Sequence, residues 1–324
     1  MSIGLVIQEK SFQSGFLQED FRVIYNMKHI KVLHNPAAGT SDHSREILKS
    51  QLEAVGFECS YYSTKETDEE EFISDRADIM AVAGGDGTVR KLADQILNRK
   101  VIRKKPPIAL LPCGTANNIG RTLNIQGTEE EIIGRWTNGN IQPFDVAELR
   151  GVNDTNFIME GFGFGVFPKL IKKMKSMKNR SEDPEEELEL ALKTLHDIIV
   201  SYKGRDCELV VNGKEIFGQY LMVEIMNVQS VGPNLNIAPL ASVNDGLLDV
   251  VLVSIEERDT LASYVMNRLK KGKDEVFFGT SIKAESVKVK WNGKLFHADD
   301  QLGEQKKKTE ISIWARKGVL EFLV

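Results

Sequence analysis

The stretch Ile79-Met80-Ala81-Val82-Ala83-Gly84-Gly85-Asp86-Gly87-Thr88 decides the fold class of this 324-residue chain. Its five leading apolar residues predict a short strand that is buried on both faces. The glycines then reverse the chain, and apolar residues at helical spacing predict a helix over Thr88–Asn98. A buried strand, a glycine turn and a helix in this order are typical of a parallel α/β sheet.

The same turn predicts an anion site. Successive glycines let the backbone approach a phosphate closely, and the following helix N-terminus supplies free N–H groups and the positive end of a dipole. A purely structural turn would explain Gly84 or Gly87, but it leaves Asp86 unexplained. Open α/β sheets bind ligands at this carboxyl edge of their strands.

Two neighbouring units repeat the pattern. The strand Lys31–His34 leads into Asn35-Pro36-Ala37-Ala38-Gly39, and the strand Ile108–Leu111 leads into Gly114-Thr115-Ala116-Asn117-Asn118. Each turn alone could be an ordinary turn or helix cap. Three small polar turns at successive strand ends converge on one cleft, which favours a triphosphate over a single phosphate.

After Asp145 the pattern changes to extended segments separated by turn signals. They predict an antiparallel β-sandwich, interrupted by a helix from Pro184 and another over Asp259–Lys271. We therefore expect an α/β domain with a parallel sheet over residues 28–145 and a β-sandwich domain over 146–311. The expected strands are Val146–Arg150, Asn156–Gly161, Cys207–Val211, Gln219–Asn227, Leu248–Ser254, Ser286–Trp291, Lys294–Ala298 and Thr309–Ala315.

Composition excludes several classes of protein. The chain is 41% hydrophobic and 27% charged, which is typical of a globular protein, and its net charge of -5 argues against broad binding of nucleic acid. Its three cysteines, Cys59, Cys113 and Cys207, have neither disulfide-framework nor zinc-site spacing, so a reducing cytoplasm fits best. No apolar run reaches the roughly 18 residues of a membrane span.

Residues 1–27 are interpreted as an N-terminal extension. They lack the basic and apolar regions of a secretory signal. Because Met27 directly precedes the first strand, an upstream start codon could have added the preceding residues. A genuine N-terminal arm is the alternative.

Five motifs, in this order, resemble the diacylglycerol kinase catalytic superfamily, which includes bacterial lipid kinases, sphingosine kinases and ceramide kinases. The resemblance covers about Lys28–Val324, although the glycine–aspartate motif alone also occurs in NAD kinases and phosphofructokinases. The motifs are Asn35-Pro36-x-x-Gly39, Gly84-Gly85-Asp86-Gly87-Thr88, Gly114-Thr115-Ala116-Asn117-Asn118, Gly161-Phe162-Gly163-Phe164-Gly165 and Ala238-Pro239 with Asn244-Asp245-Gly246-Leu247-Leu248-Asp249.

The resemblance implies a two-domain kinase that binds ATP with Mg²⁺ in the cleft between its domains. It also implies that the last strand, within residues 312–324, returns to the first domain. A structural Mg²⁺ is implied at Asp245 with the carbonyls of Ser242 and Leu247, and a tight turn is the alternative there. The implied nucleotide-binding residues are Asn35, Pro36, Gly39, Thr64, Gly84, Gly85, Asp86, Gly87, Thr88, Val89, Arg90, Gly114, Thr115 and Asn117.

Two departures from the family pattern bear on catalysis. Asn118 stands where relatives usually carry an aspartate, and Asp299-Asp300-Gln301 stands in place of an Asp-Gly-Glu triplet that supplies the general base. Because the Gln301 amide cannot accept a proton, we expect Asp299 to be the base, with Asp300 second and Glu304 third. Asp86 completes the expected catalytic set. A weakened or inactive kinase is the alternative.

A membrane lipid substrate requires contact with a bilayer, for which Lys169–Arg180 is a candidate. Its basic residues surround Leu170, Ile171, Met174 and Met177, as in an amphipathic helix at a membrane surface. A solvated connector is the alternative. We therefore expect a cytoplasmic lipid kinase that binds the inner face of the membrane transiently. An NAD-kinase-like soluble kinase and a non-catalytic lipid- and nucleotide-binding relative remain alternatives, and the sequence leaves a homodimer open.

Overall fold

The computed structural model describes residues 28–38, 44–65, 72, 76–98, 105–153, 155–177, 183–271, 276–277, 279–305 and 309–324. The predictions for residues 1–27, for Gly39 and for the end of the basic segment, Lys178 and Arg180, lie outside this part of the chain.

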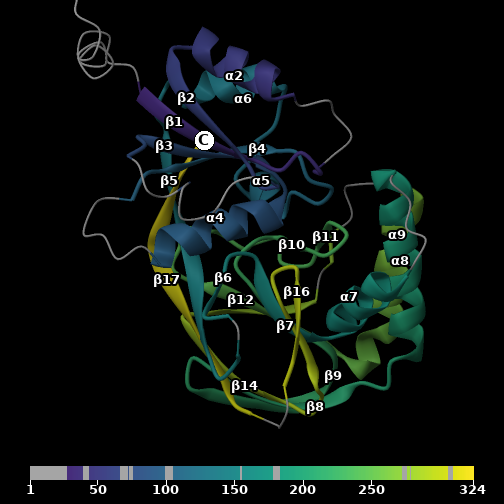
Figure 1. Cartoon of the computed structure of the whole chain (residues 1–324). Helices are drawn as coiled ribbons and strands as arrows, with labels where there is room; N and C mark the ends of the chain where they lie inside the picture. The colour runs from purple at the N-terminus through teal and green to yellow at the C-terminus, as the bar shows by residue number, and fades with distance from the viewer. Residues whose placement is uncertain are drawn as a thin grey trace, which may run out of the picture.

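The first domain is built on a parallel sheet, as predicted, and its strands lie in the order β2-β1-β3-β4. Helices α2 and α6 lie on one face of this sheet and α4 on the other (Figure 1). Every residue of β3 is buried, because helices cover the sheet on both faces. The elements are β1 (Lys28–His34), α2 (Arg45–Ala54), β2 (Phe57–Ser63), β3 (Ile79–Gly84), α4 (Asp86–Asn98), β4 (Ile108–Pro112), α5 (Asn118–Thr122) and α6 (Glu129–Trp136).

The second domain is an antiparallel β-sandwich, so the predicted fold class is confirmed. Its inner faces enclose an apolar core that includes Phe162, Phe164 and Trp291. The strands are β6 (Phe157–Ile158), β7 (Gly161–Gly165), β8 (Arg205–Val211), β9 (Lys214–Met226), β10 (Ser230–Val231), β11 (Leu235–Asn236), β12 (Leu248–Ser254), β13 (Thr280–Ala284), β14 (Ser286–Trp291), β15 (Leu295–Ala298) and β16 (Gln301–Glu304).

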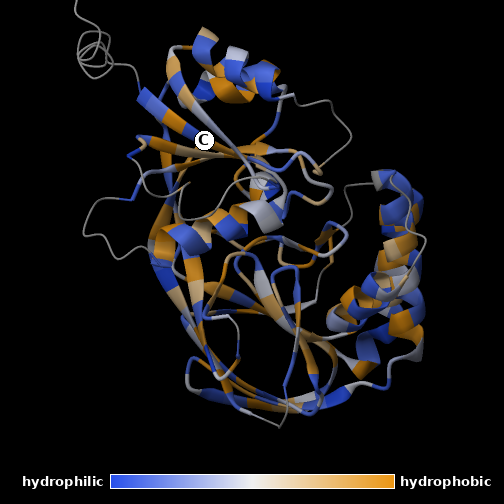
Figure 2. Ribbon diagram, viewed as in Figure 1, coloured by the Kyte–Doolittle hydropathy of each residue, from blue (hydrophilic) through white to orange (hydrophobic). Residues whose placement is uncertain are grey.

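Three helices pack together beside the sandwich: α7 (Val166–Ser176), α8 (Pro184–Ser201) and α9 (Arg258–Lys271), the last preceded by the short helix η1 (Ile255–Glu257). Asp183 caps α8 by accepting a hydrogen bond from the Glu185 N–H. Hydrophobic and hydrophilic bands alternate along these helices (Figure 2), as expected where one face packs on a core.

Two long strands, β5 (Ile141–Arg150) and β17 (Ile311–Leu323), join the domains. They pair with each other from Ser312 opposite Arg150 to Leu323 opposite Ile141. β17 begins beside β14 of the sandwich and ends beside β4 of the first sheet. The expected domain boundary at Asp145 therefore falls inside a continuous strand, and the chain end lies in the first sheet.

Candidate active site

The glycine–aspartate turn leads straight into α4, whose first residue is Asp86 rather than the expected Thr88. Side chains are excluded here by close packing. A β-carbon on Gly84 would lie 2.7 Å from Thr88 Oγ1, and one on Gly114 would lie 2.5 Å from the Gly85 Cα. The two turns thus meet backbone against backbone, and the first N–H groups of α4 are available to an anion.

Three of the predicted nucleotide-binding side chains come together at this sheet edge. Asn35 Nδ2 lies 3.5 Å from Thr88 Oγ1, and the Thr64 hydroxyl donates to Asn35 Oδ1 over 3.4 Å. The Asn35 N–H also donates to the Ala83 carbonyl, which ties the end of β1 to the end of β3. Pro36 is exposed beside them.

Asn117 shapes the second turn from within. Its backbone is left-handed, with φ 51°, and its side chain accepts from the Gly114 N–H and donates to the Pro112 and Gly114 carbonyls. The side chain is therefore engaged in holding the turn, while Thr115 beside it is exposed at the cleft.

Asp86 links the two turns. Its carboxylate accepts hydrogen bonds from the Asn118 and Ile119 N–H groups, at 2.9 and 3.0 Å, and so caps the start of α5. Burial raises its pKa to about 6, against the lowering effect of these hydrogen bonds, and the carboxylates of Asp299 and Asp300 add to the rise.

Glu160 is a cleft carboxylate that the sequence analysis missed. The Asn118 amide donates to Glu160 Oε2 over 2.9 Å, and both side chains are buried. Burial and the nearby Asp86 raise the Glu160 pKa well above its ordinary value. An aspartate at position 118 would repel this carboxylate instead of donating a hydrogen bond to it. This gives a physical reason for asparagine at a position where relatives usually carry aspartate. The only sequence signal is that Glu160 directly precedes the Gly161–Gly165 motif.

Asp299, the expected base, is buried and has both oxygens engaged. Oδ1 accepts from the Glu160 and Gly161 N–H groups, and Oδ2 lies 3.2 Å from Arg90 Nε. Its φ of 53° is part of the tight turn between β15 and β16. This geometry favours a structural role for Asp299.

Arg90 and Val89 also lie differently from expectation. Arg90 is buried, donates to the Thr155 hydroxyl over 2.7 Å, and lies over the Phe157 ring, which ties α4 to the second domain. Val89 is fully buried in the core. Both side chains are therefore engaged within the protein, and their expected nucleotide contacts stay predictions.

Asp300, the second choice for the base, lies at the surface of the cleft. It is exposed, lines the cleft, and its Oδ2 lies 3.1 Å from the point where a β-carbon on Gly87 would be. Because Gly87 has no side chain, this carboxylate can approach the glycine–aspartate turn. Gln301 and Glu304 instead line a separate hollow with Asn153.

Two further residues that the sequence analysis missed, His297 and Glu224, lie behind the Asp299–Asp300 turn. Both side chains are buried, with His297 Nε2 2.7 Å from Glu224 Oε2 and Nδ1 2.9 Å from the Asp299 carbonyl. Burial acts to lower the His297 pKa, but the Glu224 carboxylate outweighs it and the pKa is raised. A β-carbon on Gly163 would collide with Glu224, so this glycine of the Gly161–Gly165 motif makes room for the pair.

The cleft between the domains has a volume of about 310 Å³ and a mixed lining. Its polar lining includes the glycine–aspartate turn, Thr115, Glu160 and Asp300. Its apolar lining comes from Phe167, Leu170, Ile171 and Val231, which belong to α7 and β10. The arrangement can hold an anion beside an apolar group.

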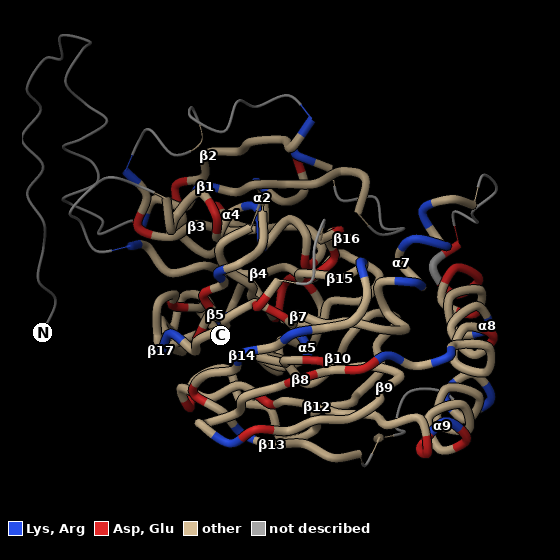
Figure 3. Tube along the Cα trace, turned by 90° about the horizontal axis from the view of Figure 1, so that it is seen from below, with Lys and Arg blue, Asp and Glu red and all other residues tan. Residues whose placement is uncertain are grey.

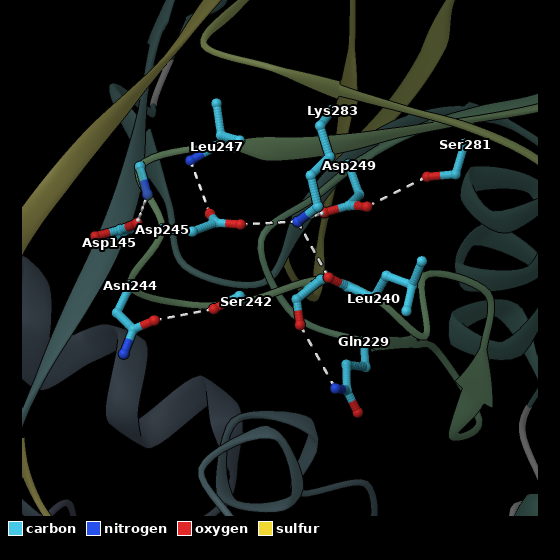
Figure 4. A network of polar contacts seen from close by, with 12 residues as sticks. Asp145, Gln229, Leu240, Ser242, Asn244, Asp245, Leu247, Asp249, Ser281 and Lys283 are labelled. Carbon is cyan, nitrogen blue, oxygen red and sulfur yellow. Dashed lines mark hydrogen bonds and ion pairs between the residues drawn. The ribbon is translucent and has the colours of Figure 1, made fainter.

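The Asp245 carboxylate, expected to hold a structural Mg²⁺, is already bonded within the protein. Asp245 Oδ2 accepts a hydrogen bond from the Lys283 ammonium over 2.8 Å, and Oδ1 accepts from the Leu247 N–H (Figure 4). Ser242 bonds through its hydroxyl to Asn244. An ammonium thus lies against the carboxylate that the resemblance assigned to the metal. Within the described ranges, no group of three His, Cys, Asp or Glu residues could hold a metal ion.

Basic residues line α7, as predicted (Figure 3). Lys169, Lys172, Lys173 and Lys175 are exposed, but Leu170 and Met174 are buried against the protein. Part of the apolar face of α7 is therefore packed, whereas the half-buried Ile171 lines the cleft. None of the helices in the described part of the chain is long and apolar enough to cross a membrane.

The chain is similar to known proteins over both domains. Residues 29–149 match the family described as diacylglycerol kinase catalytic domain, and residues 172–323 match the YegS C-terminal NAD kinase beta sandwich-like domain. The chain is 26% identical over 259 residues to a diacylglycerol kinase of Bacillus subtilis (strain 168), an alignment that covers 74% of this chain and 77% of that protein.

A diacylglycerol kinase of Staphylococcus aureus (strain MRSA252) is 22% identical over 254 residues, or 76% of each chain. Among solved structures, a diacylglycerol kinase from Bacillus anthracis str. Sterne superimposes with a TM-score of 0.68 at 22% identity, covering 91% of this chain and 96% of that one. With both domains matched in order, this chain belongs to the diacylglycerol kinase catalytic superfamily.

Proposed function

We propose that this protein is a lipid kinase, which transfers the γ-phosphoryl group of ATP to a hydroxyl group of a membrane lipid such as diacylglycerol or a sphingoid base. The observation that carries the proposal is the mixed lining of the cleft, in which the glycine–aspartate turn and Asp300 share one cavity with Phe167, Leu170 and Ile171. A lipid presents the same two parts, a polar hydroxyl beside an acyl chain.

The glycine turns before α4 and α5 support phosphate binding by the backbone. The glycines at 84, 85, 87 and 114 leave the first N–H groups of α4 accessible, and Thr88, Thr64 and Asn35 lie next to them. Bound ATP would supply the phosphoryl group, with Mg²⁺ neutralising its charge. The chain itself contributes mainly positioning, which is what phosphoryl transfer requires.

Asp300 is the proposed general base. It is the exposed carboxylate of the Asp299–Asp300 turn and approaches the glycine–aspartate turn over Gly87. From there it takes the proton of the lipid hydroxyl as that oxygen attacks phosphorus. The buried Asp299 positions it through the hydrogen bonds to the backbone at 159–161.

Membrane contact is proposed to be electrostatic rather than inserted. The exposed lysines of α7 lie on the helix that supplies apolar lining of the cleft, so contact with an anionic surface would bring the cleft opening to the lipid. Each such lysine contributes about 1 kcal/mol near an anionic surface. Transient binding to the cytoplasmic leaflet follows from this proposal.

The test is transfer of label from γ-labelled ATP to diacylglycerol, to sphingosine and to NAD, each offered alone. We expect labelled lipid, and we expect Asp300→Asn to slow its formation by at least about 100-fold. Label in NAD alone would favour an NAD-kinase-like soluble enzyme. The match of the second domain to an NAD kinase beta sandwich-like family supports this alternative. Nucleotide binding without any transfer would identify a non-catalytic relative. Either result would refute the proposal.

A further inference from the structure

The loop between β11 and β12 is held by a lysine side chain. Lys283 of β13 reaches three oxygen acceptors with one ammonium group: Asp245 Oδ2 at 2.8 Å, the Leu240 carbonyl at 3.1 Å and Asp249 Oδ2 at 3.3 Å (Figure 4). We call these four residues the Lys283 cluster. A lysine ammonium has three N–H donors, so these acceptors match its whole capacity.

The charges in the cluster also require a cation. Asp249 is 3% exposed at its side chain, and its other oxygen accepts only a neutral hydroxyl, that of Ser281. Asp245 is also largely covered. Two carboxylates that converge on one point repel each other unless a positive charge lies between them, and Lys283 supplies it.

The loop matters because it supports the strands that join the domains. Asp145 of β5 accepts hydrogen bonds from the Gly246 N–H of the loop and from the Gly318 N–H of β17, each at 2.7 Å. The Asp145 N–H in turn donates to the Val243 carbonyl. Fixing the loop therefore fixes β5 and β17 at the point where they pass from one domain to the other.

We propose that Lys283 is a built-in cation that takes the place of a bound metal ion, so that the loop is held without Mg²⁺. Carboxylate and carbonyl oxygens are the ligands that Mg²⁺ and Ca²⁺ use in proteins, and the lysine occupies them here. The inference concerns the loop alone and stands whatever substrate the active site takes.

The test compares melting temperatures of the nucleotide-free full chain in EDTA and in 10 mM MgCl₂. The wild type should change by less than about 1 °C. Lys283→Met should melt roughly 3–6 °C lower in EDTA, because it leaves two carboxylates without their cation. MgCl₂ should then restore at least about 2 °C to this variant, since the vacated oxygens can take a divalent cation.

Two further variants keep the test decisive. Lys283→Arg keeps the charge and should remain insensitive to MgCl₂. Lys288→Met removes an exposed lysine paired with Glu310 and should show neither the loss nor the response. A wild-type melting temperature that rises with MgCl₂, but does not rise in Asp245→Asn, would mean that the loop binds metal. An unchanged Lys283→Met in EDTA would mean that the lysine does not hold the loop. Either result overturns the proposal, and the wild-type comparison decides it even if Lys283→Met does not fold.

Discussion

Replacing Asp299 and Asp300 by asparagine, one at a time, should separate a structural carboxylate from a catalytic one. In Asp299→Asn the Arg90 guanidinium loses its negatively charged partner. Both side chains are buried, since Arg90 is 9% exposed and Asp299 is 1% exposed. The asparagine NH₂ group would also face another hydrogen-bond donor, either the Arg90 guanidinium or the Met159 N–H. Loss of stability is therefore the main expected effect.

The size of that effect follows from burial. Removing one partner of a buried ion pair costs about 3–5 kcal/mol, because the remaining charge stays desolvated. For a chain of this size each kcal/mol lowers the melting temperature by roughly 2–4 °C, so Asp299→Asn should melt about 10 °C below the wild type. Asp300 is exposed, and its asparagine variant should melt within about 1 °C of the wild type.

Turnover should show the opposite pattern to stability. Asp300→Asn should lower the rate of lipid phosphorylation by about 100- to 10,000-fold, the usual range for a general base, with little change in nucleotide affinity. Calorimetry, nucleotide titration and label transfer on the same preparations measure all three quantities. An Asp299→Asn variant that melts like the wild type but has lost turnover would refute this assignment, as would full turnover in Asp300→Asn.

Three further outcomes are expected from the same structure. Because the raised pKa of Asp86 lets the folded state keep a proton that the unfolded chain releases, the free energy of unfolding should fall as pH rises from about 4 to about 6, and Asp86→Asn should flatten this slope in pH-dependent denaturation. Asn118→Asp should lower the free energy of unfolding by about 1–3 kcal/mol in denaturant titrations at pH 7.5, and adding Glu160→Gln should recover most of the loss; no recovery would contradict the role given to Glu160. Alanines at three α7 lysines should weaken co-sedimentation with anionic vesicles about 100-fold, whereas three alanines on the sandwich should not; equal losses would show that only net charge matters. The α7 set is Lys169, Lys172 and Lys173, and the sandwich set is Lys203, Lys214 and Lys288.

Local signals explain why so much of the first domain could be predicted. The unbroken apolar run predicts the strand Ile79–Gly84, and the glycines that follow predict the turn after it. In the second domain Ser286–Trp291 was predicted to the residue because its two faces alternate in polarity. The short strand Gln301–Glu304 was missed because it has no such alternation and forms only by pairing with β15. Helix α6 was missed although Thr128 and Glu131 form a capping box at its start.

The sequence could not show which of Asp299 and Asp300 is buried and which reaches the cleft edge, because this depends on the handedness of a single turn. Aligning the triplet with its relatives points to Asp299, and nothing in the letters distinguishes its carboxylate from that of Asp300. In the folded chain the left-handed backbone at Asp299 belongs to a tight turn whose two carboxylates have different surroundings: one accepts three backbone N–H groups, the other approaches Gly87. Those N–H groups come from residues 159–161, far away in the chain. Long-range contacts of the same kind bring Lys283 to Asp245 and Glu160 to Asn118. In all three places the chemistry of a motif residue is set by a partner that lies far away in the chain.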